Sequence, residues 1–384
     1  MLPVLQKISQ VSFRLALFVE ITIVIVEKSE YTIPYESWWF RLTFLLCVIS
    51  LLTVKHTPRQ WFWFILFTAI GITSYLATGK NEIIRWTAFV WACQGKEMGK
   101  VFKFTFWYTV AGSLLLILLS LSGIFGSIYQ SGVFRYDFEE VRYCFGMGHP
   151  NSFHCMMLVI TWLGIYCYHE RLKWWGYALI AAAHGLLFYF TVSRTGILMS
   201  VGTLLIVMAV KYLPGIKEGR LPYLLGIVTV AASVLFSVFM AKYSVFHPFL
   251  KKLDVYLSGR IFDLINTLNS EGMLSTWSLW SDRNNVYYFD LGIVRMFYWF
   301  GILPASIYFL LQCRLLWCGF KKKDYMMAAI IICITIYSIF EAHFVSVYLG
   351  RNIFLFWFGM YLSQMVGEDG KEQSAGSTVS FRKL

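Results

Sequence analysis

Apolar runs recur along almost the whole chain and are separated by shorter polar segments. A run of about 18–25 residues crosses the hydrocarbon core of a bilayer, about 30 Å thick, as one α-helix. We therefore predict an all-α integral membrane fold with about 12 transmembrane helices. The runs lie near 8–27, 38–54, 60–79, 81–95, 102–124, 151–168, 174–191, 195–213, 222–241, 290–312, 325–347 and 352–366.

Two of the polar segments, 125–150 and 242–289, are much longer than a connection needs. The second is rich in aromatic and aliphatic residues, which predicts an ordered, functional loop. Within it, residues 260–269 have an apolar residue at every third or fourth position, which predicts a short amphipathic helix on the membrane surface. Residues 1–366 thus form one membrane domain, and the polar tail at 367–384 is predicted to be disordered.

The charged residues are distributed unevenly between the two sides of the predicted bundle. The chain carries a formal net charge of +12, with 58% hydrophobic and 14% charged residues. Lys and Arg gather in the even-numbered connections and at both ends, whereas acidic residues gather in the odd-numbered connections. By the positive-inside rule both termini, and the tail, lie in the cytoplasm, and the two long segments lie outside it. The positive charge thus indicates topology rather than nucleic-acid binding.

Ionisable residues gather where apolar runs end on the outer side. A charged group at membrane depth is costly and by default marks a functional site. Arg194, in the turn SRTG, needs an anionic partner or water. Arg351 has a simpler interpretation as a surface anchor with a long side chain, and the simplest partner for Glu20 is Arg14 in the same run. The other candidates are Arg260, Arg283, Asp290, Arg295, Glu341 and His343.

The stretch FGMGHPNSFH predicts a helix that begins at the outer surface. Gly146 and Gly148 permit a tight turn and a close approach, and Pro150 suits the first helical turn. Either Asn151 or Ser152 can cap the helix. The free N–H groups of such a terminus attract anions, phosphates included.

His149 lies beside this terminus, and His154 follows one turn into the helix. With Asn151 they are candidates for contacts to a ligand. The alternative is a well-capped helix start in which His154 only hydrogen-bonds a neighbouring span.

The sequence also lacks the motifs of several other functions. The eight cysteines lie mostly inside the apolar runs, without CxxC or Cys/His spacing, so no metal site is predicted. No P-loop or Rossmann glycine pattern occurs, which disfavours a nucleotide. Several arginines beside a helix N-terminus instead indicate a diphosphate, whose oxygens match the guanidinium fork. At the outer face of a membrane this indicates a lipid-linked donor.

Five motifs occur in order at the outer ends of successive runs. They are GHPNSFH, SRTG, LSGR, the pattern D-x-G-x-x-R-x-x-x-x-x-G from Asp290 to Gly301, and IFEAHF followed by RNIFLF. This series resembles the bacterial polysaccharide polymerases of the Wzy type, which are relatives of the O-antigen ligases. The resemblance extends over nearly the whole chain in topology, and its specificity lies in the order and sidedness of the motifs.

The resemblance implies a GT-C-like membrane glycosyltransferase that uses an undecaprenyl-diphosphate-linked oligosaccharide. It implies no nucleotide sugar, metal or other cofactor. Arg194 and Arg260 match the arginines that hold the diphosphate, with Arg295 as a third.

The base is assigned by the same resemblance. In the ligases a His-Asn pair begins the span after the long loop, and here that place reads Asp290-Leu291. Asp290 would then accept the proton of the acceptor hydroxyl, with Glu341 and His149 as rivals. Aromatic side chains of the long loop suit sugar-ring faces, although anchoring at the membrane interface explains them equally well. They are Trp277, Trp280, Tyr287 and Tyr288.

We therefore expect a polymerase of capsular or exopolysaccharide repeat units, active at the outer face of the cytoplasmic membrane. Its expected partners are membrane lipid, a flippase and a chain-length regulator. The alternatives are a ligase that passes the glycan to another acceptor, and a transporter or flippase of lipid-linked oligosaccharide. A transporter should show broken helices and charges near mid-membrane, whereas here the charges gather at one surface, which favours the enzyme.

Overall fold

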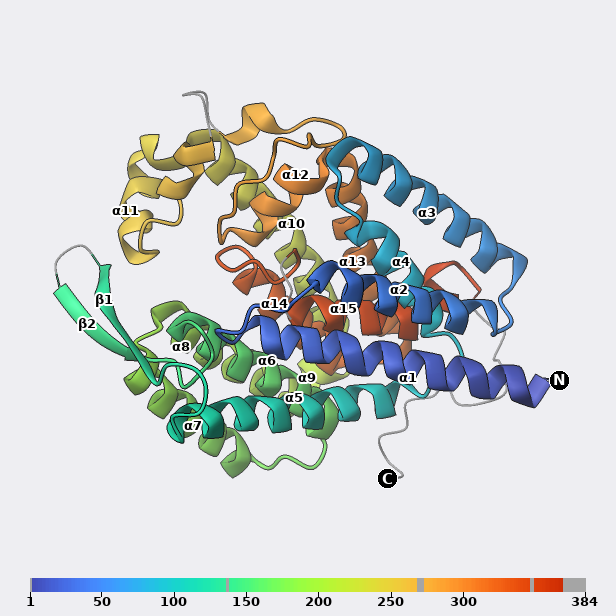
Figure 1. The fold of residues 1–384 in the computed structure, drawn as a ribbon, viewed down its shortest axis with the longest axis horizontal. Coiled ribbons are helices and arrows are strands. Elements are labelled where there is room, and N and C mark those ends of the chain that lie inside the picture. Colours follow the sequence, from blue (N-terminus) through green and yellow to red (C-terminus); the bar gives the residue numbers. More distant parts are fainter. Residues whose placement is uncertain (1, 136–137, 268–272, 346–348, 369–384) are drawn as a thin grey trace.

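The computed structural model describes residues 2–135, 138–267, 273–345 and 349–368, which form a bundle of helices with one β-hairpin (Figure 1). The predicted disordered tail lies outside the described residues from 369 onward. In chain order the elements are α1 (Leu2–Glu27), α2 (Glu36–Leu52), α3 (Pro58–Thr78), α4 (Glu82–Ala92), α5 (Met98–Leu121), β1 (Tyr129–Arg135), β2 (Phe138–Tyr143), α6 (Pro150–Tyr168), α7 (Trp174–Thr191), α8 (Arg194–Tyr212), α9 (Pro214–Lys217), α10 (Leu221–Tyr243), η1 (Ser244–Phe246), α11 (Pro248–Tyr256), η2 (Phe262–Thr267), η3 (Met273–Thr276), α12 (Gly292–Phe300), α13 (Ile302–Lys322), α14 (Tyr325–Tyr337), α15 (Leu349–Met360) and α16 (Leu362–Met365).

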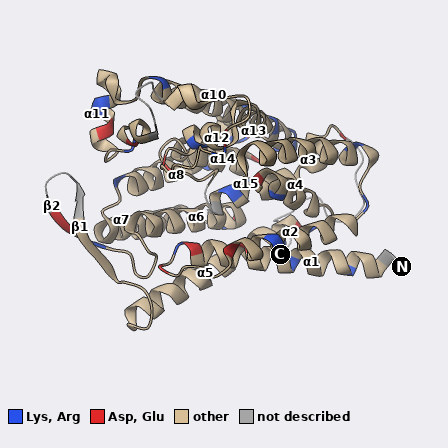
Figure 2. Ribbon diagram, turned by 45° about the horizontal axis from the view of Figure 1, so that its top comes forward, with Lys and Arg blue, Asp and Glu red and all other residues tan. Residues whose placement is uncertain are grey.

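Six helices among the described residues are long and apolar enough to cross a membrane: α1, α3, α5, α8, α10 and α13. Their outward sides carry large apolar side chains, and Leu118, Leu205 and Leu235 are 55%, 65% and 70% exposed. Apolar surface of this kind is stable when lipid covers it. Figure 2 shows long stretches of these helices without charged residues. The chain is a helical membrane protein.

The predicted number of about 12 spans is not confirmed, because several runs form helices too short to cross a bilayer alone. The helices α4, α12, α14 and α15 have 11, 9, 13 and 12 residues. At the rise of an α-helix even α14 extends only about 20 Å, against a hydrocarbon core of about 30 Å.

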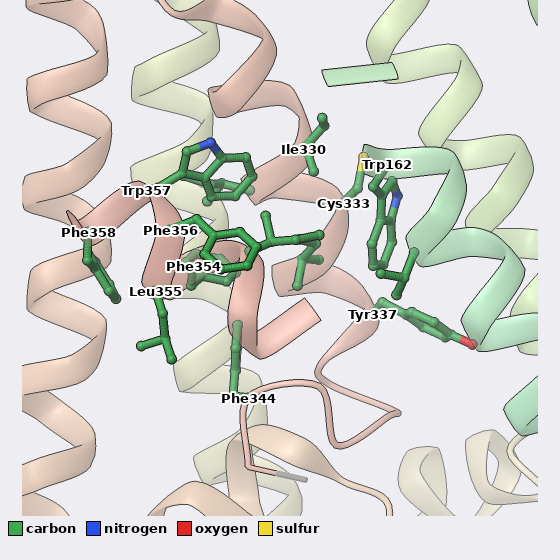
Figure 3. Close-up of a cluster of buried hydrophobic side chains, with 14 of the residues drawn as sticks. Trp162, Ile330, Cys333, Tyr337, Phe344, Phe354, Leu355, Phe356, Trp357 and Phe358 are labelled. Carbon is green, nitrogen blue, oxygen red and sulfur yellow. The ribbon is translucent and has the colours of Figure 1, made fainter. Parts of the chain in front are cut away.

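The short helices α14 and α15 form the interior of the bundle. The helix α14 packs against α6, α8, α10 and α13, and α15 packs against α4, α5 and α6. Figure 3 shows a cluster of buried apolar side chains that includes aromatic residues of α15, Cys333 of α14 and Trp162 of α6. Trp162 and Trp357 are fully buried. The helices α14 and α15 are too short to span the bilayer and are enclosed by their neighbours, and the longer helices take the lipid-facing positions.

The tenth apolar run, 290–312, is broken between α12 and α13 at Gly301, whose φ is 94°. The carbonyls of Ser278 and Leu279 accept the first two backbone N–H groups of α13, at 2.9 and 3.1 Å. These donors have no partner inside the helix. A Cβ at Gly301 would lie 2.6 Å from the backbone nitrogen of Ser281. The long polar segment therefore docks on this break because residue 301 is a glycine.

The prediction of an amphipathic helix on the membrane surface at 260–269 is wrong. Residues Phe262–Thr267 form the 3₁₀-helix η2, and residues 268–269 lie outside the described part of the chain. Ile261 and Leu264 are fully buried, and Ser244 Oγ donates to the carbonyl of Ile261 at 3.1 Å. These two side chains pack into the protein instead of facing a membrane surface.

The segment 125–150 contains an antiparallel hairpin that the apolar pattern does not predict. In it, β1 pairs with β2, and Tyr129 lies opposite Tyr143. The hairpin joins the fold through α7, because the Tyr143 ring packs edge-on against Phe190, with centroids 5.5 Å apart.

Polar contacts distinguish two ends of the bundle, one at each end of α1. Near the start of α1, Lys96 contacts Ser9. Just beyond its last residue, Glu30 accepts the N–H of Ser127 at 3.1 Å. We call the first the basic end and the second the opposite end. Segment 277–290 also lies at the opposite end, because Lys80, which lies after the last residue of α3, donates to the carbonyl of Asn285 at 3.1 Å.

Candidate functional site

Arg260 lies on a tight turn directly after α11, at the opposite end. The two residues before it have φ values of 58° and 85°. The Asp254 carboxylate, on α11, accepts the backbone N–H groups of the two residues that follow Arg260, at 2.6 and 3.3 Å. Burial raises the pKa of Asp254, and these two hydrogen bonds oppose the rise. Asp254 thus fixes the backbone that carries Arg260.

Two carboxylates from distant parts of the chain share the Arg260 guanidinium. Its Nη2 donates to Oε1 of Glu341 at 2.5 Å, and its Nε lies 3.2 Å from Oδ2 of Asp290. The side chains of Arg260 and Glu341 are 9% and 4% exposed, whereas that of Asp290 is 42% exposed. The Nη1 atom of Arg260 is buried without a hydrogen-bond partner among the described residues. A buried donor without a partner is costly, so Nη1 suits an acceptor atom of a ligand.

The charges of these three groups, which we call the Arg260 triad, do not balance. When all three are ionised, the carboxylates outnumber the guanidinium. Glu341 lies in the connection after α14; burial raises its pKa to about 7, which Arg260 opposes and Asp290 reinforces. Because the two carboxylates interact through one cation, the triad is suited to accept a proton.

A glycine brings the two carboxylates together. Gly292 begins α12, two residues after Asp290, and a Cβ there would lie 2.5 Å from the carbonyl oxygen of Glu341 and 2.9 Å from that of Ser338. The N–H of Ile293 donates to the same Ser338 carbonyl at 3.1 Å. The glycine in D-x-G is therefore the position where α12 meets the segment that carries Glu341.

Replacing Gly292 with alanine should separate Asp290 from Glu341, because the new methyl group meets backbone atoms that cannot rotate away. We expect a loss of stability of about 1–3 kcal/mol together with loss of the activity proposed below. Thermal unfolding and the transfer assay check this. The matched control is Gly202→Ala in α8, where an added Cβ meets nothing within 4 Å. Equal behaviour of the two variants would contradict the role of Gly292.

The helix α6 begins at Pro150 as predicted, but its cap is His149 rather than Asn151 or Ser152. The Nδ1 of His149 accepts the N–H of Asn151 at 3.2 Å, so the neutral ring carries its proton on Nε2. Asp290 and Arg260 lie close enough for their charges to act on this ring. The charges of Asp290 and Arg260 thus act on a ring whose Nε2 can donate a hydrogen bond.

The glycines before α6 have the predicted role. Gly146 and Gly148 have φ values of 80° and 65°, and a Cβ at Gly148 would lie 3.1 Å from the carbonyl oxygen of Ser29. The turn before α6 therefore packs on the chain just beyond α1.

Lys28, in that same place, is a cation that the sequence pattern does not single out. It follows α1 and is half-buried. Burial lowers the pKa of Lys28 to about 8, and the charges of Glu27, Arg295 and Arg351 also act on it. Its own charge acts on Glu341, so Lys28 is a further cation that influences the Arg260 triad.

Arg295 and Arg351 are both buried, at 0% and 2% exposure. The Arg295 guanidinium lies over the ring of Tyr288, 3.9 Å from its centroid. Arg351 donates to Glu20 at 2.8 Å, so Arg351 is not a surface anchor, and Glu20 pairs with it and not with the predicted Arg14.

Two predicted arginines are not bonded to the triad. Arg194 is exposed at the first residue of α8, where Ser193 caps the helix by accepting the N–H of Gly196 at 3.4 Å. Arg283 donates to the carbonyl of Leu76 at 3.1 Å, in the last turn of α3. Arg283 therefore stabilises a helix end, where cations are favoured.

His154 is fully buried within the bundle. Its Nδ1 lies 3.2 Å from Thr191 Oγ1, and its Nε2 lies 3.3 Å from Ser200 Oγ and 3.4 Å from His184 Nδ1. These contacts match the alternative given from the sequence, hydrogen bonding to neighbouring helices. His154 thus holds α7 and α8 together, and with them the turn that carries Arg194.

The predicted aromatic residues are only partly available to a sugar. Trp277 stacks on Phe297, with centroids 4.5 Å apart, which covers one face of its ring. Tyr288 packs against Arg295. Trp280 is half-buried, and Tyr287 and Tyr288 are 37% and 56% exposed, so these three rings are more accessible to a sugar than that of Trp277.

Comparisons with known proteins do not assign a family. No family model, curated protein or solved structure matches the chain. The site itself offers a buried guanidinium donor, an accessible carboxylate beside it, and further cations at the same end of the bundle.

Proposed function

We propose that this chain is a membrane glycosyltransferase that polymerises undecaprenyl-diphosphate-linked repeat units into a capsular polysaccharide or exopolysaccharide. The observation that carries the proposal is the Arg260 triad: a buried guanidinium with one open donor, beside a carboxylate that is 42% exposed. A diphosphate is the leaving group for which such a donor is suited, and a reachable carboxylate is the group that deprotonates a sugar hydroxyl.

In this proposal the acceptor hydroxyl attacks the anomeric carbon of the donor sugar. The bond between that carbon and the diphosphate oxygen breaks, and undecaprenyl diphosphate leaves with the electron pair. Arg260 and the Nε2 proton of His149 stabilise the charge that develops on the leaving group. Asp290 accepts the proton of the hydroxyl, and Glu341 holds the Arg260 guanidinium in place.

Further cations take part in the proposed donor site. The charge of Lys28 acts on Glu341, and the charge of Arg295 acts on Lys28. Arg194, exposed at the start of α8, contacts the outer part of the donor in this proposal. No metal or other cofactor is part of the proposed reaction.

The proposed location follows from the charge pattern. The basic end lies in the cytoplasm with both termini, and the opposite end, with the Arg260 triad, faces outward from the cytoplasmic membrane. The donor then arrives from a flippase, and a chain-length regulator is a further expected partner.

Purified protein in liposomes, supplied with lipid-linked repeat units, tests this proposal. Gel analysis of the glycans should show a ladder of longer chains. Transfer of single units only to another added acceptor would instead indicate a ligase, and movement of unextended units between leaflets would indicate a flippase. Either of these results without a ladder contradicts the proposal.

Lys28 predicts how donor binding depends on pH. Its pKa is lowered to about 8, so its charge is present below pH 8 and is lost as the pH rises through that value. The KM for the donor should therefore increase above pH 8, and Lys28→Arg should move this increase to higher pH because arginine stays charged. KM measured from pH 6 to 9.5 checks this, and identical profiles would exclude Lys28 from donor binding.

A further inference from the structure

An apolar groove lies on the outside of the bundle, between the second half of α1 and the start of α2. It has a volume of about 960 Å³. Its wide edge is open, since Phe18, Tyr35 and Trp38 are 45%, 80% and 63% exposed. It is lined by Phe18, Val19, Thr22, Ile23, Val26, Tyr31, Ile33, Pro34, Tyr35, Trp38 and Trp39.

The groove ends beside Lys28 and the turn that precedes α6. Its lining residues Val26 and Tyr31 are on either side of Lys28 in the chain, and Lys28 acts on Glu341 through its charge. The carbonyl of Ser29, one residue later, lies against the glycine turn that precedes His149. A hydrocarbon chain in the groove would therefore have its head group near Lys28 and the turn that carries His149.

We propose that this groove binds the polyprenyl chain of a lipid-linked diphosphate substrate, which rests on the function proposed above. Five of its eleven lining residues are aromatic and none is charged. Flat aromatic rings suit the methyl branches and double bonds of an isoprenoid. The cation at its end complements a diphosphate, so chain and head group are recognised together.

The test uses donors that carry the same diphosphate and sugars but either a long or a short prenyl chain. The variant Val19→Trp fills the groove, and Leu15→Trp, exposed on α1 outside the groove, is the matched control. Val19→Trp should raise the KM for the long-chain donor by about tenfold or more, because the buried apolar contact is lost, and leave the short-chain donor unchanged. If both donors weaken equally, or if Val19→Trp behaves like Leu15→Trp, the groove does not hold the chain.

A second measurement separates this proposal from the proposed function. A sugar-free polyprenyl diphosphate with a photoreactive chain should label peptides from 18–39 in wild-type protein in nanodiscs, and Val19→Trp should reduce the labelling. This readout needs no transfer activity, so it stands even if no ladder is formed. Equal competition by phosphatidylglycerol would show a general lipid groove and overturn the assignment.

Discussion

Replacing Arg260 with alanine should abolish chain growth, with a rate at least about 10²–10³ times lower, the loss seen when one donor that stabilises a developing oxyanion is removed. Arg260 is the only member of its triad that can donate to a diphosphate, because Asp290 and Glu341 are carboxylates. Arg260→Lys should restore little of the rate of chain growth, since an ammonium group cannot hold both carboxylates and a ligand in the geometry of the guanidinium fork. The ladder assay gives the rate.

Loss of Arg260 also leaves Glu341 buried without its cation, which destabilises the fold on its own account. The double variant Arg260→Ala/Glu341→Gln removes that unpaired charge and should recover the melting temperature without recovering transfer. Lys251→Ala, exposed on the neighbouring α11, is the control for a lost cation. Normal chain growth in a well-folded Arg260→Ala protein would exclude the proposed role in diphosphate binding.

Replacing Asp290 with asparagine should lower the turnover number by about 10²–10⁴-fold, the usual contribution of a positioned base, with little change in donor affinity. Asp290 is preferred to its rivals on accessibility and chemistry. Its side chain is 42% exposed, against 4% for Glu341. The Nδ1 of His149 already accepts a hydrogen bond from Asn151, which leaves that ring as a donor.

Glu341→Gln is the comparison that distinguishes the two carboxylates. It should affect transfer mainly through donor affinity, because Glu341 orients Arg260 and does not meet the acceptor. A turnover number within twofold of wild type in Asp290→Asn, with a large loss in Glu341→Gln, would reverse the assignment. Steady-state kinetics with purified donor measures both quantities.

The sequence predicts the start of α6 well because the signals there are local. Proline at the first turn and glycines at positive φ have the same meaning in any protein, and Pro150, Gly146 and Gly148 take these roles. The cap is His149, two residues before Asn151, because its Nδ1 can accept the backbone N–H of Asn151 in the first turn.

The number of spans could not be predicted because apolar length does not distinguish a helix in lipid from one inside the protein. The helix α14 is as apolar as any lipid-facing helix, yet it has only 13 residues and packs among α6, α8, α10 and α13. Gly301 was the one local sign of a broken run, and its effect depends on docking of residues 278–281, far along the polar segment.

The charge pairs of the site depend on contacts across the whole sequence. Arg14 is the nearest cation to Glu20 in the chain, but it is exposed, and Glu20 pairs with Arg351 at 2.8 Å. The sequence around Lys28 does not distinguish it from other lysines that follow an apolar run. Its role depends on the packing of the end of α1 against the turn at Gly148. The motifs identified Arg260, Asp290 and Glu341 individually, and the fold brings their side chains into contact.

The most direct test is a structure of the protein in nanodiscs with a non-hydrolysable lipid-linked diphosphate analogue. The account predicts that a phosphate oxygen lies about 2.7–3.2 Å from Nη1 of Arg260, at ordinary hydrogen-bond distance, with the anomeric carbon on the side of Asp290. A diphosphate bound at another place, with Arg260 still enclosed by Asp290 and Glu341 alone, would contradict it.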